Sequence, residues 1–561
     1  MIPARFPRWR PAWRGGVATF AAAAWMVAVD NLRFWDIATA AAPAGPLARA
    51  RVLLGFAAVL TALALVVLLP LAFGRLRKPW LAVVLLLGAI AGYFTHDYGA
   101  VVDRFALQSV FETDAREALE WLSARAFGSL ALAWLLPVAL LAWLRIERRP
   151  WRAELLGWCK LLGLAVLLFA GGVLVAGREI AATVRNHRGL VYVMNPASLV
   201  AASLSYAHAR GESAAGPLQP LGRDARRTGA MAPGKRPLVL VLVIGESARA
   251  QSFQLGGYAR PTNPELAARP VAYFPDVRSC GTNTAVSLPC MFSGLGREGY
   301  EEGSVMRREN LLDVLAHAGF RIDWYDNNTG SKRIAIRAHE ESFADSRDPR
   351  FCTEACVDGI LVDRLQRELQ ATQADRAIVL HTVGSHGPAY YLRYPPAFER
   401  FRPACRSNRL SGCSRDEVRN AYDDTILYTD HVVASAIDAL AADPGFDTAL
   451  VYVSDHGEST GEKGLYLHGA PYLLAPDEQT RVPMLLWMSD GFRARRGIDP
   501  ACVDRQRRLP ASHDNLFDLV LGLAGVETEA YRERLDPLAP CMPRADATAD
   551  AAPADRAGAL Q

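Results

Sequence analysis

Cysteine is scarce in the first half of this sequence, and long apolar runs are scarce in the second. Only Cys159 precedes position 279, whereas eight cysteines follow it. Apolar residues form long runs between Gly15 and about Gly177 and only short runs from Lys235 onward. A chain of 561 residues is also too long for one compact domain. The sequence therefore predicts an N-terminal part for a membrane and a C-terminal part that folds in water.

Neither a charge imbalance nor a zinc knuckle is present. The 62 basic residues nearly balance 58 acidic ones, which argues against a nucleic-acid binder. No C-x-x-C motif occurs, so disulfides are favoured over a structural zinc site. The late cysteines are spaced as pairs, and their even number indicates an oxidising compartment, although sequence alone does not fix their connectivity. The predicted pairs are Cys280–Cys290, Cys352–Cys356, Cys405–Cys413 and, by elimination, Cys502–Cys541.

Five apolar segments approach the roughly 20 residues that a helix needs to cross a bilayer. The third is short, and the first carries Asp30 and Asn31 near its end. A cleaved signal peptide is the alternative for the first segment, but four further spans follow and no clear small-residue cleavage site precedes a polar region. We therefore expect a domain of five helices over residues 1–178. The segments are 15–37, 52–73, 80–94, 127–144 and 159–176.

Basic residues indicate how these segments are oriented. They cluster before the first segment, between the second and third, and between the fourth and fifth, which the positive-inside rule assigns to the cytoplasm. Five crossings then place everything after Ala176 outside, in agreement with the cysteines. The basic residues are Arg5, Arg8, Arg10, Arg14, Arg75, Arg77, Lys78, Arg145, Arg148, Arg149 and Arg152.

Two stretches on the outer side are expected at the membrane surface. The loop 98–125 mixes acidic and apolar residues, which suits either an amphipathic interfacial helix or a solvated charged face. Glu112 on this loop is a candidate contact for the amine of a lipid headgroup. Residues 179–236 read as an interfacial helix followed by a flexible linker rich in Gly, Pro, Ala and Arg.

The C-terminal half alternates strands and helices. Continuous apolar runs such as 238–244 indicate strands buried on both faces, as in a parallel sheet covered by helices. Similar runs lie at 376–386 and 448–456, with helical patterns at 309–318, 359–370 and 422–440. We expect an α/β domain with a mostly parallel central sheet over 237–545 and a disordered tail over 546–561.

Metal-binding residue types follow three of these strands. Glu246 follows the first, His386 the second, and Asp455 with His456 the third. Ligands in open α/β sheets bind beyond the carboxyl ends of the strands, so these side chains should converge. Carboxylates and imidazoles, with His468 shortly after, are suited to zinc.

The stretch 279–290 has the features of a nucleophile loop. Two cysteines bracket Thr282 and Thr284, and the residues that follow can begin a helix. A hydroxyl at a helix start is favoured as a nucleophile, because the helix N-terminus stabilises negative charge. The alternative is a disulfide-closed loop with Thr284 as an ordinary N-cap. The residues alone leave both interpretations, and both threonines, open.

Together these motifs resemble the phosphoethanolamine transferases of Gram-negative bacteria, which include the lipid A phosphoethanolamine transferases and the mobile colistin-resistance enzymes. The resemblance covers essentially the whole chain. It implies a multi-pass protein of the bacterial inner membrane with a periplasmic domain of the alkaline phosphatase and sulfatase superfamily. The matching stretches are Glu246, 279–293, 326–332, 385–388, 454–458 and 467–469.

The resemblance also implies roles for individual residues. Zinc would be bound by Glu246, Thr284, Asp455 and His456, with Thr284 rather than Thr282 as the nucleophile, and a second zinc stays open. The phosphoethanolamine group, the acceptor or that second zinc would be contacted by Asn328, Lys332, His386 and His468, of which His386 and His468 are candidate proton carriers.

The implied reaction is zinc-dependent transfer of phosphoethanolamine from phosphatidylethanolamine to lipid A through an ester on a threonine. Such transfer reduces the negative charge of lipid A and so weakens attraction of cationic peptides such as polymyxins. We expect a monomer that contacts membrane lipids and no nucleic acid. The alternatives are a core sugar or another glycan as acceptor, a phosphodiester hydrolase or glycerophosphate transferase of the same superfamily, and a sensor with a degenerate enzyme fold.

Overall fold

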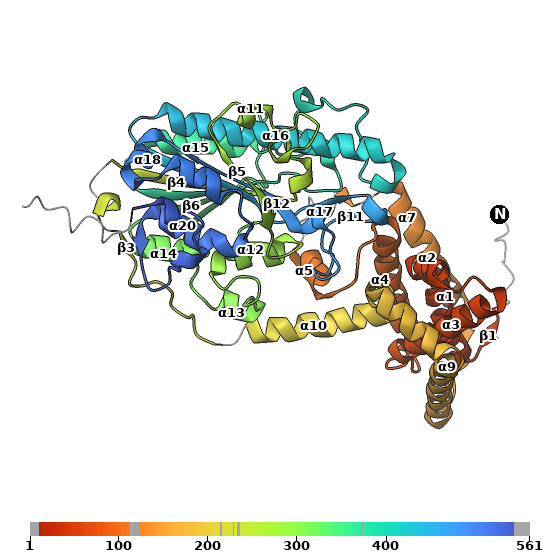
Figure 1. The fold of residues 1–561 in the computed structure, drawn as a ribbon. Helices are drawn as coiled ribbons and strands as arrows, with labels where there is room; N and C mark the ends of the chain where they lie inside the picture. Colours follow the sequence, from red (N-terminus) through yellow and green to blue (C-terminus); the bar gives the residue numbers. More distant parts are fainter. Residues whose placement is uncertain are drawn as a thin grey trace, which may run out of the picture. The chain divides into compact units, whose positions relative to one another are not determined.

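The computed structural model of the chain describes residues 10–112, 118, 120–121, 123–213, 216–227, 229–232, 236–371 and 374–543. The predicted tail 546–561 lies outside these residues. The chain forms two compact units (Figure 1). The first consists of Met1–Arg210, Ser407–Cys413 and Thr460–Leu474, and the second of Gly211–Arg406, Ser414–Ser459 and Ala475–Gln561.

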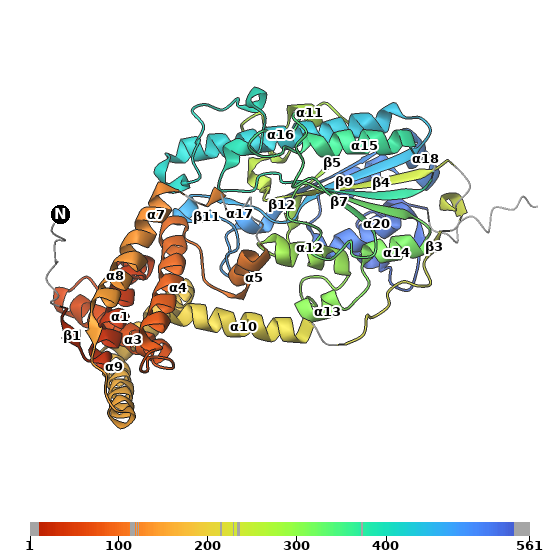
Figure 2. The same ribbon diagram turned by 180° about the vertical axis from the view of Figure 1, so that it is seen from behind.

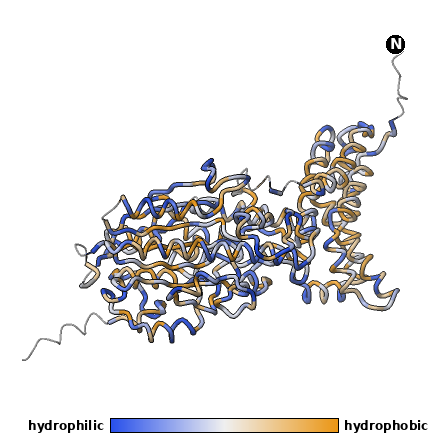
Figure 3. The backbone as a smooth tube through the Cα atoms, turned by 90° about the horizontal axis from the view of Figure 1, so that it is seen from above, coloured by the Kyte–Doolittle hydropathy of each residue, from blue (hydrophilic) through white to orange (hydrophobic). Residues whose placement is uncertain are grey.

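The first unit is built from apolar helices, along which hydrophobic residues run (Figure 3). Four helical stretches are long and apolar enough to cross a membrane, namely α3, α4, Ala124–Trp143 and α9. A fifth span results if α1 and α2, which meet at 62°, are counted together. The helices are α1 (Gly15–Val29), α2 (Leu32–Ala41), α3 (Pro46–Leu68), α4 (Arg77–Tyr98), α5 (Arg104–Glu112), α7 (Ala124–Leu130), α8 (Leu136–Trp143), α9 (Trp151–Asn186) and α10 (Ala197–Ser213).

These helices confirm the predicted helical N-terminal domain, although the bounds of all five predicted segments differ, and the differences in the first and third have a visible cause. The first is broken where Asp30 and Asn31 interrupt the apolar run, and Asn31 instead donates hydrogen bonds to the carbonyl oxygens of Met26 and Asn195, at 2.9 and 3.0 Å. The third is longer than predicted, because its polar ends continue the helix to Gly99, whose positive φ of 71° terminates it. Both differences arise from polar residues that a hydropathy pattern does not resolve.

Close packing between α3 and α9 depends on glycine. A Cβ on Gly172 would lie 2.7 Å from the carbonyl oxygen of Gly55, and one on Gly55 would lie 2.7 Å from the Cβ of Ala176. Small residues at such positions let membrane helices approach closely.

Part of the loop 98–125 is helical, as α5. Val110 and Phe111 on this helix are exposed, which fits the amphipathic interpretation. Glu112 is its last residue, and its side chain lies outside the described part of the structure. In the predicted interfacial stretch, a 3-10 turn at Arg188–Val193 precedes α10.

The second unit contains an eight-stranded sheet in the order β13-β5-β12-β9-β4-β8-β6-β7. Strand β12 runs antiparallel to both its neighbours, and every other pair is parallel, which confirms a mostly parallel sheet. The strands are β4 (Leu238–Gly245), β5 (Ala272–Arg278), β6 (Arg321–Asp326), β7 (His339–Ser342), β8 (Arg376–His381), β9 (Asp447–Ser454), β12 (Arg481–Met488) and β13 (Ala511–Ser512).

Helices cover both faces of this sheet (Figures 1 and 2). Alternate residues of β4 join a core that includes Phe292, Leu315 and Leu519 from the helices of one face. That face carries α12 (Thr284–Ser293), α14 (Leu311–His317) and α20 (Leu516–Ala524), and the other carries α15 (Gly359–Ala371) and α16 (Arg415–Ala442).

Three of the predicted cysteine pairs lie at disulfide distance in the second unit. They are Cys280–Cys290, Cys352–Cys356 and Cys502–Cys541, with Cα–Cα distances of 6.2, 4.0 and 5.3 Å. Cys405 and Cys413 belong to different units, so their pairing stays a prediction. Cys159 is a free, exposed cysteine of the first unit.

Candidate active site

Residues from several strand ends of the second unit meet at one buried point. Glu246 directly follows β4, and Asp455 and His456 directly follow β9. The three side chains are at most 1% exposed. Since β4 and β9 are parallel neighbours, their carboxyl ends lie side by side, as the sequence predicted for these residues.

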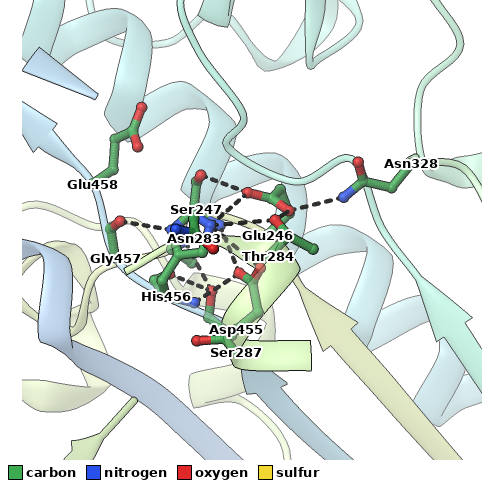
Figure 4. Close-up of polar contacts among 12 residues, drawn as sticks. Glu246, Ser247, Asn283, Thr284, Ser287, Asn328, Asp455, His456, Gly457 and Glu458 are labelled. Atoms are coloured by element: carbon green, nitrogen blue, oxygen red, sulfur yellow. Dashed lines mark hydrogen bonds and ion pairs between the residues drawn. The ribbon is translucent and has the colours of Figure 1, made fainter. Parts of the chain in front are cut away.

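The side chain of Thr284, the first residue of α12, also lies at this point, beside Glu246 (Figure 4). Its Oγ1 donates a hydrogen bond to Glu246 Oε2 at 2.9 Å and lies 3.4 Å from His456 Nε2. The N-cap is Asn283, whose side chain accepts from the Val286 amide at 3.0 Å. The alternative of Thr284 as the N-cap is therefore wrong, because Asn283 already caps the helix. Thr284 instead places its hydroxyl at the positive end of the helix dipole.

The imidazole of His456 faces two carboxylates. Its Nε2 lies 3.3 Å from Glu246 Oε1 and 3.3 Å from Asp455 Oδ2, while Nδ1 donates to the Gly457 carbonyl oxygen at 3.0 Å. The bond to Gly457 fixes the tautomer, so in the neutral ring the Nε2 lone pair points toward the carboxylates. Two anions and a lone pair facing one another call for a cation between them.

The closeness of the two carboxylates and the imidazole also shifts the pKa values of Asp455 and His456. Burial raises the pKa of Asp455 to about 6, and the nearby Glu246 carboxylate adds to the shift. Burial alone would lower the pKa of His456, but the Asp455 and Glu246 carboxylates raise it to about 10. Without a metal, a proton on His456 is thus what offsets the negative charge.

This donor set fits a divalent metal ion. Glu246 and His456 each offer a ligand atom, and Asp455 Oδ2, which faces His456 Nε2, is buried without a hydrogen bond from any described residue. Carboxylate oxygens, an imidazole nitrogen and a hydroxyl are ligand types that zinc accepts. His468 lies on Thr460–Leu474, which is described with the first unit, so its predicted role stays a prediction.

A second set of buried residues supports Glu246. The Asn328 side-chain amide donates to Glu246 Oε2 and to the Thr382 carbonyl oxygen, both at 2.9 Å. The Asn328 backbone amide donates to Asp326, whose other oxygen lies 2.7 Å from His381 Nδ1. Asn328 therefore positions a carboxylate, whereas its predicted contact with substrate stays a prediction.

Asp326 and His381 form an ion pair that the sequence analysis did not identify as part of the site. Burial would raise the pKa of Asp326 and lower that of His381, but their mutual attraction reverses both shifts. Asp326 ends β6 and His381 ends β8, so the strand-end rule applies to both, but the sequence predicted no strand at 321–326 and a second strand that continued past His381.

His513 was also not predicted as a site residue, because a lone histidine outside any motif does not indicate a function. Its Nδ1 accepts from the Cys280 amide at 3.0 Å, and its Nε2 donates to the Ser454 carbonyl oxygen at 2.9 Å. Burial lowers its pKa to about 4, which keeps the ring neutral. His513 thus joins the loop before Thr284 to the end of β9.

Three further residues of the predicted motifs have contacts of other kinds. His386 follows Ser385, whose amide donates to the Glu246 carbonyl oxygen at 2.9 Å, and its own side chain is half-buried. Lys332 donates through Nζ to the Thr329 carbonyl oxygen at 3.2 Å on its own loop. Glu458 accepts from the Tyr390 hydroxyl at 2.7 Å, and its side chain is turned away from Thr284 (Figure 4).

Comparison with known proteins identifies relatives of both halves of the chain. A family model described as Phosphoethanolamine transferase EptA/EptB matches residues 60–210, and the Sulfatase model matches residues 239–526. The chain is 38% identical to phosphoethanolamine transferase EptA of Escherichia coli (strain K12) over 517 residues, which cover 91% of this chain and 94% of that protein.

Two further relatives agree. Phosphatidylethanolamine transferase Mcr-1 of Escherichia coli is 33% identical, with 91% of this chain and 95% of that protein covered. The solved structure of the integral membrane protein lipooligosaccharide phosphoethanolamine transferase A from Neisseria meningitidis is 31% identical, has a TM-score of 0.90, and covers 95% of this chain and 99% of its own. These matches extend over nearly the full chain and its site, and the chain belongs to the phosphoethanolamine transferase family of enzymes.

Proposed function

We propose that the chain transfers phosphoethanolamine from phosphatidylethanolamine to lipid A of lipopolysaccharide, with Thr284 as the nucleophile. The observation that carries this proposal is the position of Thr284 Oγ1, 2.9 Å from Glu246 and 3.4 Å from His456 at the start of α12. The name of Mcr-1 supports phosphatidylethanolamine as the donor, and that of the Neisseria enzyme supports a lipooligosaccharide acceptor.

A zinc ion held by Glu246, Thr284, Asp455 and His456 would supply Lewis acidity and lower the pKa of the Thr284 hydroxyl. The hydrogen bond to Glu246 gives the hydroxyl proton an acceptor. Thr284 Oγ1 then attacks the donor phosphorus, the bond from phosphorus to the glycerol oxygen breaks, and diacylglycerol leaves with a proton.

The second half-reaction reverses the roles. An acceptor oxygen of lipid A attacks the phosphorus of the Thr284 ester, and the threonine oxygen leaves and regains its proton. His386 and His468 are the proposed proton carriers, and Lys332 offsets phosphate charge. The protein would work as a monomer in the inner membrane, with residues 237–545 in the periplasm and Glu112 near the donor headgroup.

Covalent labelling tests the nucleophile. Purified protein incubated with phosphatidylethanolamine labelled in its headgroup should become labelled, Thr284→Ala should not, and Thr282→Ala should keep the label. Thr282 is a matched control because it is a buried threonine of the same loop. Label retained on intact Thr284→Ala protein would remove Thr284 as the nucleophile.

Mass spectrometry of lipopolysaccharide tests the acceptor. Cells that express the chain should carry phosphoethanolamine on lipid A, and cells that express Thr284→Ala should not. Phosphoethanolamine found only on a core sugar would contradict the proposed acceptor but leave the transfer chemistry intact.

A further inference from the structure

A cavity of about 450 Å³ lies within the first unit, among α1, α2, α4 and α7. Apolar side chains line part of it, but charged groups line the remainder, which is unusual for a helix bundle in a membrane. The lining residues that matter here are Asp30, Asp97, Arg125, Ser129, Leu132 and Arg409.

Asp30 is the main anomaly of this cavity. It is 1% exposed, and neither of its carboxylate oxygens has a hydrogen-bond partner among the described residues. Gly88 on α4 leaves room for it, since a Cβ there would lie 2.8 Å from Asp30 Oδ2. A buried carboxyl group is stable only when it is protonated or paired with a cation, so this position is suited to a cationic ligand.

Arg409 supplies the opposite charge. Its Nε is also buried without a hydrogen-bond partner in the described structure. The segment that carries it belongs to the first unit, where the Tyr98 hydroxyl donates to the Asn408 carbonyl oxygen at 3.3 Å. Arg409 is thereby fixed near the end of α4 with a guanidinium able to bind an anion.

The other strong charges of the cavity already neutralise each other. Arg125 donates to both oxygens of Asp97, at 2.6 and 2.7 Å. The histidine that lines the cavity, His96, has its Nδ1 3.8 Å from Oδ2 of Asp36, which lies outside the cavity. Among the described residues that line the cavity, the Asp30 carboxylate and the Arg409 guanidinium therefore remain, and the cavity also has an apolar side at Leu132, an exposed residue.

The position of the cavity relative to the bilayer also indicates which class of ligand it binds. Successive spans cross a membrane in alternating directions, so the end of α4 and the start of the next span, at α7, share one face of the bilayer. A ligand with an ammonium group, a phosphodiester and acyl chains matches the two charges, the apolar side and this depth. We propose that the cavity binds the headgroup of a zwitterionic phospholipid, with its ammonium at Asp30 and its phosphate at Arg409.

Lipid binding at this cavity goes beyond the transfer reaction. The lipid's identity as the phosphoethanolamine donor rests on the proposed function, but binding itself does not. Lipid binding can therefore be measured without turnover, in full-length Thr284→Ala protein.

Native mass spectrometry of that protein in detergent tests the site. The ligands are short-chain phosphatidylethanolamine, phosphatidylglycerol with the same acyl chains, and free phosphoethanolamine. The variants Asp30→Asn and Arg409→Gln each remove one charge, and Ser129→Phe fills the cavity with both charges kept. Glu147→Gln, at a half-exposed carboxylate that does not line this cavity, is the matched control.

We expect phosphatidylethanolamine to bind tightest to the parent and to the control. In Asp30→Asn, the preference for phosphatidylethanolamine over phosphatidylglycerol should fall by roughly tenfold or more. Arg409→Gln should weaken binding of both lipids by a similar factor. Ser129→Phe should weaken both lipids even if a charge variant fails to fold. Equal binding of free phosphoethanolamine would show that the acyl chains are not recognised, and unchanged lipid binding in all three variants would overturn the proposal.

Discussion

His456 uses its two ring nitrogens differently. Nδ1 donates to the Gly457 carbonyl oxygen, whereas Nε2 faces the Glu246 and Asp455 carboxylates. A proton or a metal ion can occupy the space at Nε2, but not both. The proposed zinc site therefore depends on each of the two carboxylates as well as on the imidazole.

Removing one carboxylate should release the metal. We expect the zinc content of purified Asp455→Ala, measured by elemental mass spectrometry, to fall to a small fraction of that of the unmodified protein. Glu458→Gln is the matched control, because Glu458 is an equally buried acid of the same motif that bonds to Tyr390. Equal zinc in the unmodified protein and Asp455→Ala would contradict the assigned ligand.

His513 should make stability depend on pH. Its folded pKa of about 4 lies below the ordinary value of 6.5, so between these values the unfolded chain binds a proton that the folded chain does not. Stability from this group is complete above pH 6.5 and declines as the pH falls toward 4, by up to ~1.4 kcal/mol per pH unit.

Comparison of the unmodified protein with His513→Asn measures this effect. Melting temperatures taken from pH 7 to pH 4, with a chelator present so that metal release does not contribute, should differ most at pH 7 and converge toward pH 4. A difference that stays constant with pH would show that His513 does not need to be neutral.

At the scale of elements, α12 determines where the proposed nucleophile, Thr284, lies. Its N-cap Asn283 is adjacent to Thr284, so loss of the cap should both destabilise the helix and displace the hydroxyl. We expect Asn283→Ala to cost about 1 kcal/mol of stability and to lower transfer activity by roughly tenfold to a hundredfold.

Asn310→Ala provides the matched control. Asn310 caps α14 through the Leu312 amide at 2.9 Å, and α14 carries none of the proposed site residues. The melting temperature should fall in both variants, whereas activity should fall only in Asn283→Ala. An equal loss of activity in both would mean that general destabilisation, and not the position of Thr284, is responsible.

The residues that follow the strands could be predicted from the sequence, but the residues that support them could not. A buried strand followed by a polar residue is visible in the sequence, so Glu246, Asp455 and His456 could be predicted to converge. Asn283 could not be selected as the cap, because several residues of that loop can cap a helix and only the fold decides among them. His513 joins two segments that are 59 and 233 residues away, and such long-range hydrogen bonds leave no local pattern.

The direction of one strand and the bend of one helix could not be predicted from the sequence. The antiparallel direction of β12 depends on the strands beside it, and its apolar run reads the same in either direction. In the first unit, the break at Asp30 and Asn31 was visible as polarity in an apolar segment. Whether such polarity bends a helix depends on partners such as Asn195, 164 residues away.

At the scale of the whole molecule, the cysteine pairs of the second unit should differ in their contribution to stability. Cys502–Cys541 closes a loop with a separation of 39 residues, whereas Cys352–Cys356 closes one of 4. In the chain-entropy model, the longer loop stabilises by about 4 kcal/mol and the shorter by about 2.

Reduction should therefore lower the melting temperature of the full-length protein. Replacing Cys502 and Cys541 together by Ser should account for more of this loss than replacing Cys352 and Cys356. A melting temperature unaffected by reductant would argue against structural disulfides, and the reverse order would show that strain or contacts outweigh loop length.

The central position of β4 should make its amide hydrogens exchange slowly. All eight of its residues are buried, and it is bonded along both edges, to β8 and β9. Its amide hydrogens can exchange with deuterium only through the largest opening of the domain, so they should be among the last to do so. Glu246 follows β4 directly, which attaches this proposed metal ligand to a long-lived part of the fold. Fraying at the sheet edges, at β7 or β13, would then leave the residues of the candidate site assembled.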